Sequence, residues 1–175
     1  MFAEKKDKIL ELETRKKIYE FVRKYSGCHF RELERKSGLA HGTLTYHLHF
    51  LVKHNLLTYK KENNTSRYFP AEIKENTALL GVLRQTALRK IILFLLAEES
   101  YHEEIVRFLR LSPSTVSWHL KKLTNEGIIS TTKLGRKTKY KLAIDKEEII
   151  KLLITYKESF LDARVNRTIE AWELR

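Results

Sequence analysis

Two stretches of the chain repeat the same order of hydrophobic and polar positions. Each begins with apolar residues at helical spacing, which predicts an amphipathic helix. These residues are Ile18, Phe21 and Val22 in the first stretch and Ile91, Phe94 and Leu95 in the second. A shorter helical pattern follows at residues 30–36 and again at residues 103–109. Each stretch is therefore expected to open with two helices.

A third helix and a pair of strands are predicted in each stretch, after tight turns at Gly38 and Arg110. In the second stretch Ser112 is a suitable N-cap, Pro113 fits the first helical position, and the helical pattern ends near Gly127. Runs of β-type residues then flank turn residues, at 56–60 and 67–69 and at 128–132 and 138–142. Three helices followed by a hairpin form a winged helix-turn-helix plan. We therefore expect a mainly α protein with small β-hairpin wings.

The two stretches are copies of one domain. With the sequence laid on itself at an offset of 72, Thr43 meets Thr115 and His47 meets His119. Upstream the offset is 73, so one residue has been gained or lost in a loop between. A period this long with two copies indicates a domain duplication. The expected parts are a first winged helix-turn-helix domain at 1–70, a helical linker at 71–86, a second such domain at 87–142 and a C-terminal helix at 143–175.

The third helix of the second copy has one apolar stripe and one polar face. Val116, Leu120 and Leu123 form the stripe that should be buried. In helix-turn-helix proteins the opposite face of this helix enters the major groove of DNA, with its first turns against base edges. Short hydroxyls can reach bases or phosphates there, and cations can reach the backbone. The DNA-contacting residues predicted for the second helix and hairpin are Ser114, Thr115, Ser117, Trp118, Lys121, Lys122, Lys133, Arg136, Lys137 and Lys139.

The first copy offers a similar face with fewer fixed charges. Its predicted DNA-contacting residues are Thr43, Thr45, Tyr46, His49, Lys60, Lys61 and Arg67. We expect the second wing to make the stronger phosphate or minor-groove contact, although a charged hairpin can also be merely solvated. Tyr46 and Trp118 occupy equivalent positions, where each could stack on DNA or cover a domain junction. The equivalent His47 and His119 could bond a phosphate or satisfy a polar edge of the domain.

The positive charge of the chain is confined to the two copies. The formal net charge is +12 and the isoelectric point is about 9.7. Residues 14–70 hold twelve Lys and Arg against four Asp and Glu, and residues 85–142 hold eleven against five. The remaining segments are nearly neutral. This distribution favours a polyanionic partner for both copies.

Several other classes of protein fit the sequence poorly. No apolar run approaches the roughly 18 residues of a membrane span, and the first residues are too charged for a signal peptide, so we expect a cytoplasmic protein. The single cysteine, Cys28, allows no internal disulfide. His41, His47, His49 and His54 lack the i, i+4 spacing that would pair two ligands on one helical face, so no metal is expected. We also expect no cofactor and no enzymatic activity, because phosphate-loop and nucleophile motifs are missing.

A family resemblance covers nearly the whole chain. The segment 111–127, followed by a basic hairpin, resembles the ArsR/MarR-type winged helix of prokaryotic regulators. The tandem arrangement, with a helical linker through residues 79–84, resembles tandem winged-helix regulators of archaea. The cysteine motif and the C-terminal ligands of ArsR-type metal sensors are missing from the corresponding positions. The resemblance therefore implies the fold and DNA binding without metal sensing.

The C-terminal segment also keeps helical spacing of apolar residues, and a long amphipathic helix needs an apolar partner. That partner could be the other repeat or the same helix of a second chain. The resemblance favours a homodimer. The residues predicted for dimerisation are Ile149, Leu153, Tyr156, Phe160, Val165 and Ile169.

The expected function is that of a sequence-specific regulator of transcription that binds double-stranded promoter DNA, with basal transcription factors as further partners. The main alternative is a winged-helix scaffold or a subunit of the transcription machinery that binds mainly proteins. Such a module would not need its positive charge confined to both repeats. RNA binding is a further alternative, but the stacking platforms of RNA modules are not evident in the sequence.

Overall fold

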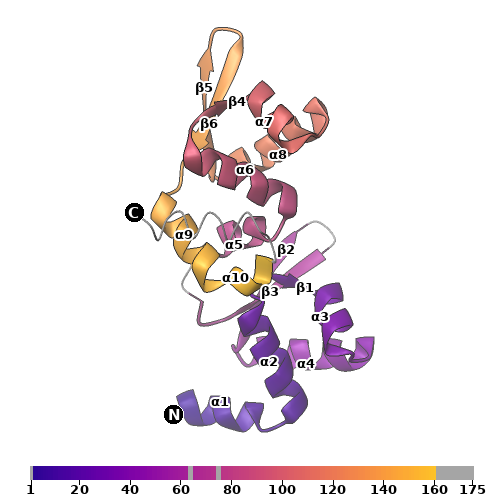
Figure 1. The fold of residues 1–175 in the computed structure, drawn as a ribbon. Coiled ribbons are helices and arrows are strands. Elements are labelled where there is room, and N and C mark those ends of the chain that lie inside the picture. The colour runs from indigo at the N-terminus through magenta and orange to yellow at the C-terminus, as the bar shows by residue number, and fades with distance from the viewer. Residues whose placement is uncertain (1, 63–64, 74–75, 161–175) are drawn as a thin grey trace. The chain divides into compact units, whose positions relative to one another are not determined.

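The computed structural model describes residues 2–62, 65–73 and 76–160. The chain divides into two compact units, Met1–Thr77 and Ala78–Arg175. Figure 1 shows that each unit combines several helices with a small sheet. The prediction of a mainly helical chain with two tandem winged domains is confirmed.

The described residues of the first unit form four helices and a three-stranded sheet. Its elements are α1 (Phe2–Leu10), α2 (Glu13–Lys24), β1 (Cys28–His29), α3 (Phe30–Ser37), α4 (His41–Lys53), β2 (Leu57–Glu62) and β3 (Thr65–Pro70). The strands lie antiparallel in the order β1-β3-β2, with Tyr68 opposite both Cys28 and Tyr59. Strand β1 was not predicted, because a strand of two residues has no recognisable alternation of apolar and polar positions.

The second unit repeats this order and adds helices at its end. Its elements are α5 (Thr77–Leu83), α6 (Thr86–Ala97), β4 (Ser100–Tyr101), α7 (His102–Leu109), α8 (Pro113–Asn125), β5 (Ile129–Leu134), β6 (Lys137–Leu142), α9 (Lys146–Thr155) and α10 (Lys157–Phe160). The strand order is β4-β6-β5. In Figure 1 the hairpin β5–β6 extends away from α7 and α8. It is the wing of this unit.

The elements of the two units match one for one. From β1 and β4 onward, each element of the first unit recurs 72 positions later with the same length. The helices α2 and α6 are related by 73 positions. The offset changes by one residue between these helices and the strands that follow them. Residues 25–27 connect α2 to β1 in the first unit, and residues 98–99 connect α6 to β4 in the second. The predicted gain or loss of one residue thus lies in this connection.

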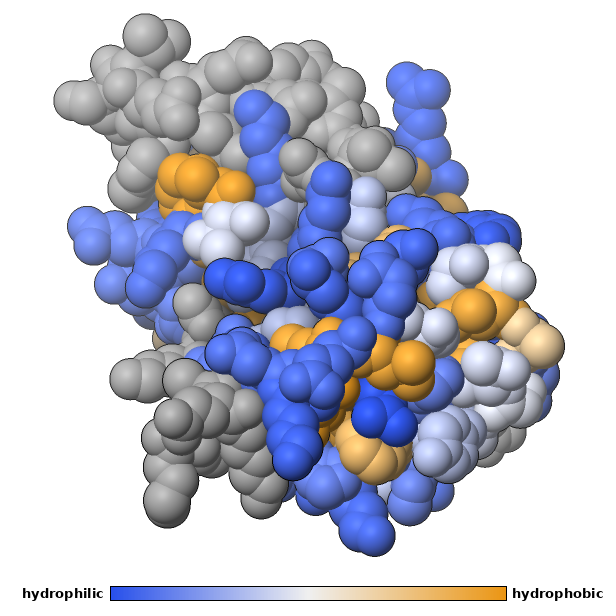
Figure 2. Space-filling model, turned by 90° about the horizontal axis from the view of Figure 1, so that it is seen from below, coloured by the Kyte–Doolittle hydropathy of each residue, from blue (hydrophilic) through white to orange (hydrophobic). Residues whose placement is uncertain are grey.

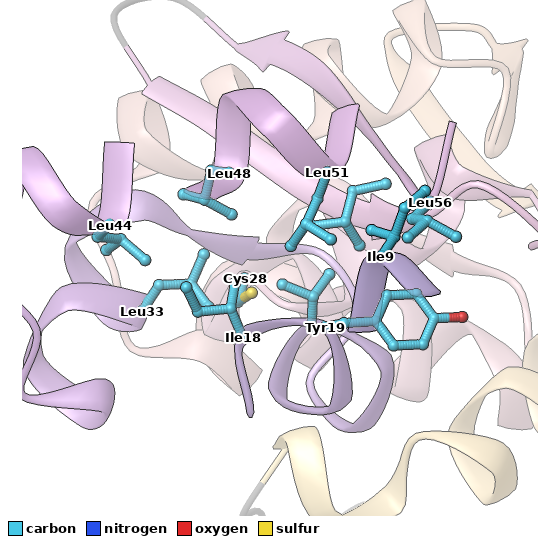
Figure 3. Packing of buried hydrophobic residues seen from close by; sticks show 11 residues of the cluster. Ile9, Ile18, Tyr19, Cys28, Leu33, Leu44, Leu48, Leu51 and Leu56 are labelled. Carbon is cyan, nitrogen blue, oxygen red and sulfur yellow. The ribbon is translucent and has the colours of Figure 1, made fainter. Parts of the chain in front are cut away.

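The predicted apolar stripes of the third helices are buried. Leu44, Leu48 and Leu51 of α4 are at most 1% exposed. They pack with residues of α2 and α3, such as Ile18 and Leu33, in the cluster drawn in Figure 3. In the second unit Val116, Leu120 and Leu123 are equally buried. This burial fixes which face of α4 and of α8 remains on the surface.

Two turn positions have a left-handed backbone in both units. The residue after the second helix of each helix-turn-helix is Gly38 with φ 67° in the first unit and Arg110 with φ 56° in the second. The turn before the wing contains Asn55 with φ 57° and Gly127 with φ 69°. Arg110 adopts this conformation although it is unfavourable in free energy for any residue with a Cβ atom, a cost that glycine avoids. The backbone path is therefore kept while the residue type changes.

The C-terminal segment differs from the predicted single long helix. The helix α9 ends at Thr155, and Tyr156 leaves the helical conformation with φ −112° and ψ 26° before α10 begins. Four of the residues predicted for dimerisation are already buried within the chain, which corrects their assignment to an exposed interface. They are Ile149, Leu153, Tyr156 and Phe160. Val165 and Ile169 lie outside the described residues.

The burial of the C-terminal helices involves Arg89 of α6. Its Nη1 atom donates to the carbonyl oxygen of Leu83 at 2.6 Å, and its Nη2 atom donates to the carbonyl oxygen of Phe160 at 3.4 Å. The guanidinium also lies over the Phe160 ring. The amphipathic pattern thus indicated a helix that needs a partner, and the end of the described segment contacts Arg89 of the second unit.

Candidate nucleic-acid interface

The start of α8 is fixed by the side chain of Ser112. Its Oγ accepts a hydrogen bond from the backbone N–H of Thr115 at 3.2 Å, and Pro113 occupies the first turn. The same oxygen lies 3.1 Å from Oγ of Ser114 and 2.7 Å from Oγ1 of Thr115. The predicted cap is confirmed, and it gathers three hydroxyls at the helix end that is expected to face DNA.

The polar face of α8 is on the surface as predicted. The exposed residues on it are Ser114, Thr115, Ser117, Trp118 and Lys121. Trp118 is 57% exposed, an unusual environment for a large aromatic side chain. Lys122 is half-buried instead, and its Nζ donates to Oε1 of Gln85 at 3.1 Å. Lys122 therefore already has a partner within its own unit.

The second wing carries its cations near a tight turn. Leu134 pairs with Lys137 across the hairpin, which leaves Gly135 and Arg136 as the two turn residues. Gly135 has φ 61°, a conformation that a glycine at the first turn position of a type II′ hairpin provides without strain. Lys133, Arg136 and Lys137 are exposed. The wing thus presents an exposed cationic tip.

Two predicted wing cations have acidic neighbours. Nζ of Lys139 lies 3.0 Å from Oε2 of Glu99, and this contact raises the pKa of Lys139 and lowers that of Glu99. Nζ of Lys137 lies 3.9 Å from Oε2 of Glu103 at an exposed position. Exposed pairs of this kind contribute little to stability, so a phosphate can replace the carboxylate at modest cost.

The recognition helix and the wing of the second unit meet at one hollow. The hollow has a volume of about 370 Å³. Ser117 of α8 lines it together with Arg136 and Lys137 of the wing, and Tyr101 and His102 close it from the start of α7. The structure therefore brings predicted contact residues of two different elements onto one surface.

The first unit has an equivalent but larger hollow of about 790 Å³. Phe30, Thr45 and Tyr68 line it at the positions that His102, Ser117 and Tyr140 occupy in the second unit. Its other predicted contacts lie on the surface: Thr43, Tyr46, His49 and Lys61 are exposed, and Lys60 is half-buried. The unit offers a comparable face that is poorer in cations.

Large apolar side chains on the described surface are scattered. In Figure 2 hydrophilic residues cover most of the visible described surface, with small hydrophobic patches between them. Tyr46 is 59% exposed, at the position of α4 that Trp118 occupies in α8. An aromatic side chain thus stands on the predicted DNA face of each unit.

Arg67 does not take the predicted place on the first wing. It is 4% exposed, and its Nη1 donates to the backbone carbonyl oxygen of Gly27 at 2.9 Å. Strand β3 alternates so that Arg67 and Phe69 both point inward. The prediction that Arg67 contacts DNA is therefore wrong, because this guanidinium joins the wing to the body of the unit.

His47 and His119 lie at the inner edge of the third helices. Burial lowers the pKa of both side chains, with a further lowering from the positive charge of Arg15 for His47 and of Lys122 for His119. In each ring Nδ1 is buried and has no hydrogen-bond partner among the described residues. The ring of His47 packs edge-on against Tyr46, and that of His119 against Trp118. Both histidines therefore lie at the edge of their domain and not on the exposed face of the third helix.

Other kinds of site find little support in the described part of the chain. Residues 2–62, 65–73 and 76–160 contain no cluster of three or more His, Cys, Asp or Glu side chains that could hold a metal ion. Within the same residues no helix is both long and apolar enough to cross a lipid bilayer.

These features define a chain with two winged helix-turn-helix domains. Comparison with protein families gives the same result, because residues 12–78 match an N-terminal HTH domain and residues 87–131 match the bacterial regulatory proteins of the arsR family. The chain therefore carries two helix-turn-helix domains in tandem, the second of arsR type. The family resemblance expected from the sequence is confirmed for both copies.

Several known proteins are similar to the chain. A transcriptional regulator of HTH type from Methanocaldococcus jannaschii, itself uncharacterized, is 34% identical over 134 residues, which are 77% of this chain and 34% of that protein. The chain thus spans about a third of its relative's length.

Solved structures of regulators are also similar to parts of the chain. HlyU from Vibrio cholerae is 26% identical, with a TM-score of 0.41 over 46% of this chain and 87% of that one. A possible transcriptional regulator for arsenical resistance is 24% identical, with a TM-score of 0.38 over 54% and 95%.

Proposed function

We propose that this chain is a sequence-specific regulator of transcription that binds double-stranded promoter DNA and has no enzymatic activity. One observation supports this function above the others. In the second unit, Ser117 of α8 and Arg136 of the wing face the same hollow, and Lys121 is exposed on the same helix. A third helix and wing with such side chains suit base edges and phosphates. The relative from Methanocaldococcus jannaschii, named as a transcriptional regulator, agrees with this proposal.

The two units would contribute differently. In the second unit α8 would lie in the major groove with its hydroxyls and Trp118 against the bases, while Lys133 and Arg136 would contact the backbone or the minor groove. In the first unit α4 presents Thr43 and Tyr46 with little fixed charge, so it would add contacts to bases and sugars rather than phosphate neutralisation. We propose the second unit as the main source of electrostatic affinity.

We further propose that the chain forms a homodimer, acts in the cytoplasm and has basal transcription factors as partners. Dimers of helix-turn-helix proteins bind two half-sites related by twofold symmetry. Four apolar residues of α9 are buried within their own chain, whereas Ile154 is 44% exposed and would be available to a dimer contact.

The salt dependence of DNA binding tests the proposal. The affinity of the full chain for labelled duplex DNA should fall steeply between low and physiological salt, because each phosphate contact releases counterions. Changing Lys121 or Arg136 to alanine should weaken binding and reduce the slope of log affinity against log salt by about 1 for each lysine or arginine that no longer neutralises a phosphate. Fluorescence anisotropy over a salt series measures both quantities.

Lys151→Ala is the matched control, because Lys151 is exposed on α9, outside α8 and the wing. It removes the same charge and should alter the slope much less. A flat salt response of the unmodified chain would refute the proposed function. Equal effects of Lys151→Ala and Arg136→Ala would show that α8 and the wing are not the contact surface.

A further inference from the structure

The hydroxyl of Ser117 is held by a histidine from the neighbouring helix. Nε2 of His102 lies 2.8 Å from Oγ of Ser117, which is a strong hydrogen-bond distance. The two residues are 15 positions apart in sequence, and both line the hollow between α8 and the wing. A contact between the start of α7 and the middle of α8 thus reaches the surface that is proposed to face DNA.

The backbone around His102 is itself well fixed. Tyr101 pairs with Lys139 across β4 and β6, and its N–H donates to Oε2 of Glu104 at 2.8 Å. This side-chain cap fixes the start of α7 one residue before His102. On the other side, the neighbouring Val116 and Leu120 anchor the helix that carries Ser117 in the core. A hydrogen bond between two fixed backbones restricts the serine hydroxyl to one rotamer.

A free serine hydroxyl is a poor discriminator of bases, because it can donate or accept. When Nε2 of His102 accepts from Ser117, the serine oxygen offers only lone pairs and suits the amino groups of cytosine or adenine. When Nε2 donates instead, the serine proton is free for the acceptors of guanine or thymine. The hydrogen bond removes the donor choice when Nε2 accepts, whereas a donating Nε2 leaves the serine its proton and one lone pair.

We propose that His102 is a positioning residue that makes Ser117 discriminate at one base pair of the bound DNA. The inference rests on the proposed function, since it assigns a source of sequence specificity to the same surface. His102 acts through Ser117 and needs no contact with DNA of its own.

The first unit supplies a natural comparison. Phe30 and Thr45 stand at the positions of His102 and Ser117 and line the equivalent hollow. Thr45 donates through Oγ1 to the carbonyl oxygen of His41 in its own helix at 2.8 Å. The fold thus accepts phenylalanine at the position of His102, which makes His102→Phe a suitable variant.

Selection from a library of randomised duplex DNA tests the proposal. The full-length chain, His102→Phe, Ser117→Ala and the double variant are each used to enrich bound sequences, and relative affinities are then measured for single base-pair changes. His102→Phe should lower the preference at one base pair by about two- to tenfold, the worth of one hydrogen bond. Ser117→Ala should lower the preference at the same base pair. In the double variant the two reductions should not add, because both substitutions remove one interaction.

Controls separate this role from a structural one. His102→Gln retains a hydrogen-bonding side chain and should keep part of the preference, whereas a loss of stability would weaken binding to all sequences equally. Equal weakening for all sequences, additive reductions in the double variant, or an unchanged preference in His102→Phe would each overturn the proposal. If the unmodified chain binds duplex DNA but enriches no sequence, or does not bind it, the proposed function fails as well. If it enriches a motif that His102→Phe shares, this proposal alone fails.

Discussion

Arg67 and Lys139 occupy matching positions on the two wings and have opposite environments. Arg67 is buried and donates to the carbonyl oxygen of Gly27, whereas Lys139 is a third exposed and pairs with Glu99. A buried guanidinium with a backbone acceptor stabilises the fold, and a surface lysine can exchange its carboxylate for a phosphate. Equivalent cations of the two copies therefore have different environments, and only Lys139 is accessible to the proposed phosphate contact.

Replacing Arg67 by alanine should destabilise the first unit without a specific effect on phosphate contacts. The Gly27 carbonyl would be left without this buried donor, which costs about 1–3 kcal/mol in free energy of unfolding. Denaturant unfolding measures this decrease, and anisotropy measures the salt slope of DNA binding.

Lys61→Ala on strand β2 of the same wing is the control, because Lys61 is exposed. It should change the free energy of unfolding by less than about 0.5 kcal/mol and should reduce the salt slope. The interpretation of Arg67 would be refuted if its variant kept full stability and lowered the slope instead.

Residues whose environment depends on local pattern could be predicted from the sequence. The stripe through Leu44 and Leu48 and the cap at Ser112 follow from helical spacing and capping chemistry alone. The burial of Arg67 could not be predicted in this way, because it depends on a hydrogen bond to a backbone carbonyl 40 positions earlier in the chain. The contact between His102 and Ser117 was also missed, since it joins two helices across a turn.

The third helices of the two units differ in how they begin. Helix α8 has Ser112 as its N-cap, with a hydrogen bond to the N–H of Thr115. Helix α4 has Ala40 at the equivalent position, which offers no side-chain acceptor. Without a side-chain cap, an N–H group in the first turn of α4 can be satisfied only by water. We therefore expect α4 to fray more readily than α8.

Exchanging the two caps tests this difference. Ala40→Ser should raise the free energy of unfolding of the first unit by about 1 kcal/mol, because serine can accept from a first-turn N–H. Ser112→Ala should lower that of the second unit by about 0.5–2 kcal/mol. Hydrogen exchange of the amides in the first turns of α4 and α8 would locate both changes, and a gain from Ala40→Ser spread evenly over the chain would contradict the explanation.

On the scale of the whole molecule, the two units carry equivalent histidines, of which His47 is buried and His119 is half-buried. The pKa values of His47 and His119 are lowered by burial, so both rings are neutral in the folded chain at neutral pH. Their ordinary pKa is about 6.5. As the pH falls through this value, the unfolded chain takes up protons before the folded chain does. The contribution of the neutral histidines to the free energy of unfolding is therefore present at a pH above their ordinary pKa and is lost as the pH falls below it.

The free energy of unfolding should thus decrease as the pH falls from neutral, until the lowered pKa values of the folded state are reached. In His47→Gln and His119→Gln this decrease should be smaller, and in the double variant smaller still. His49→Gln is the control, because His49 is exposed two positions along the same helix. Denaturant titrations at a series of pH values measure the effect. An unchanged pH dependence in the double variant would disprove it.

The contact between Arg67 and Gly27 has a counterpart in the second unit. Gly27 and Glu99 are 72 positions apart, as are Arg67 and Lys139, so each wing cation contacts the matching residue of its own unit, a backbone carbonyl in one copy and a carboxylate in the other. The same contact leaves Arg67 buried and Lys139 partly exposed. Paralogous halves of one gene can therefore differ in how deeply a side chain is buried while its position and the position of its partner are kept.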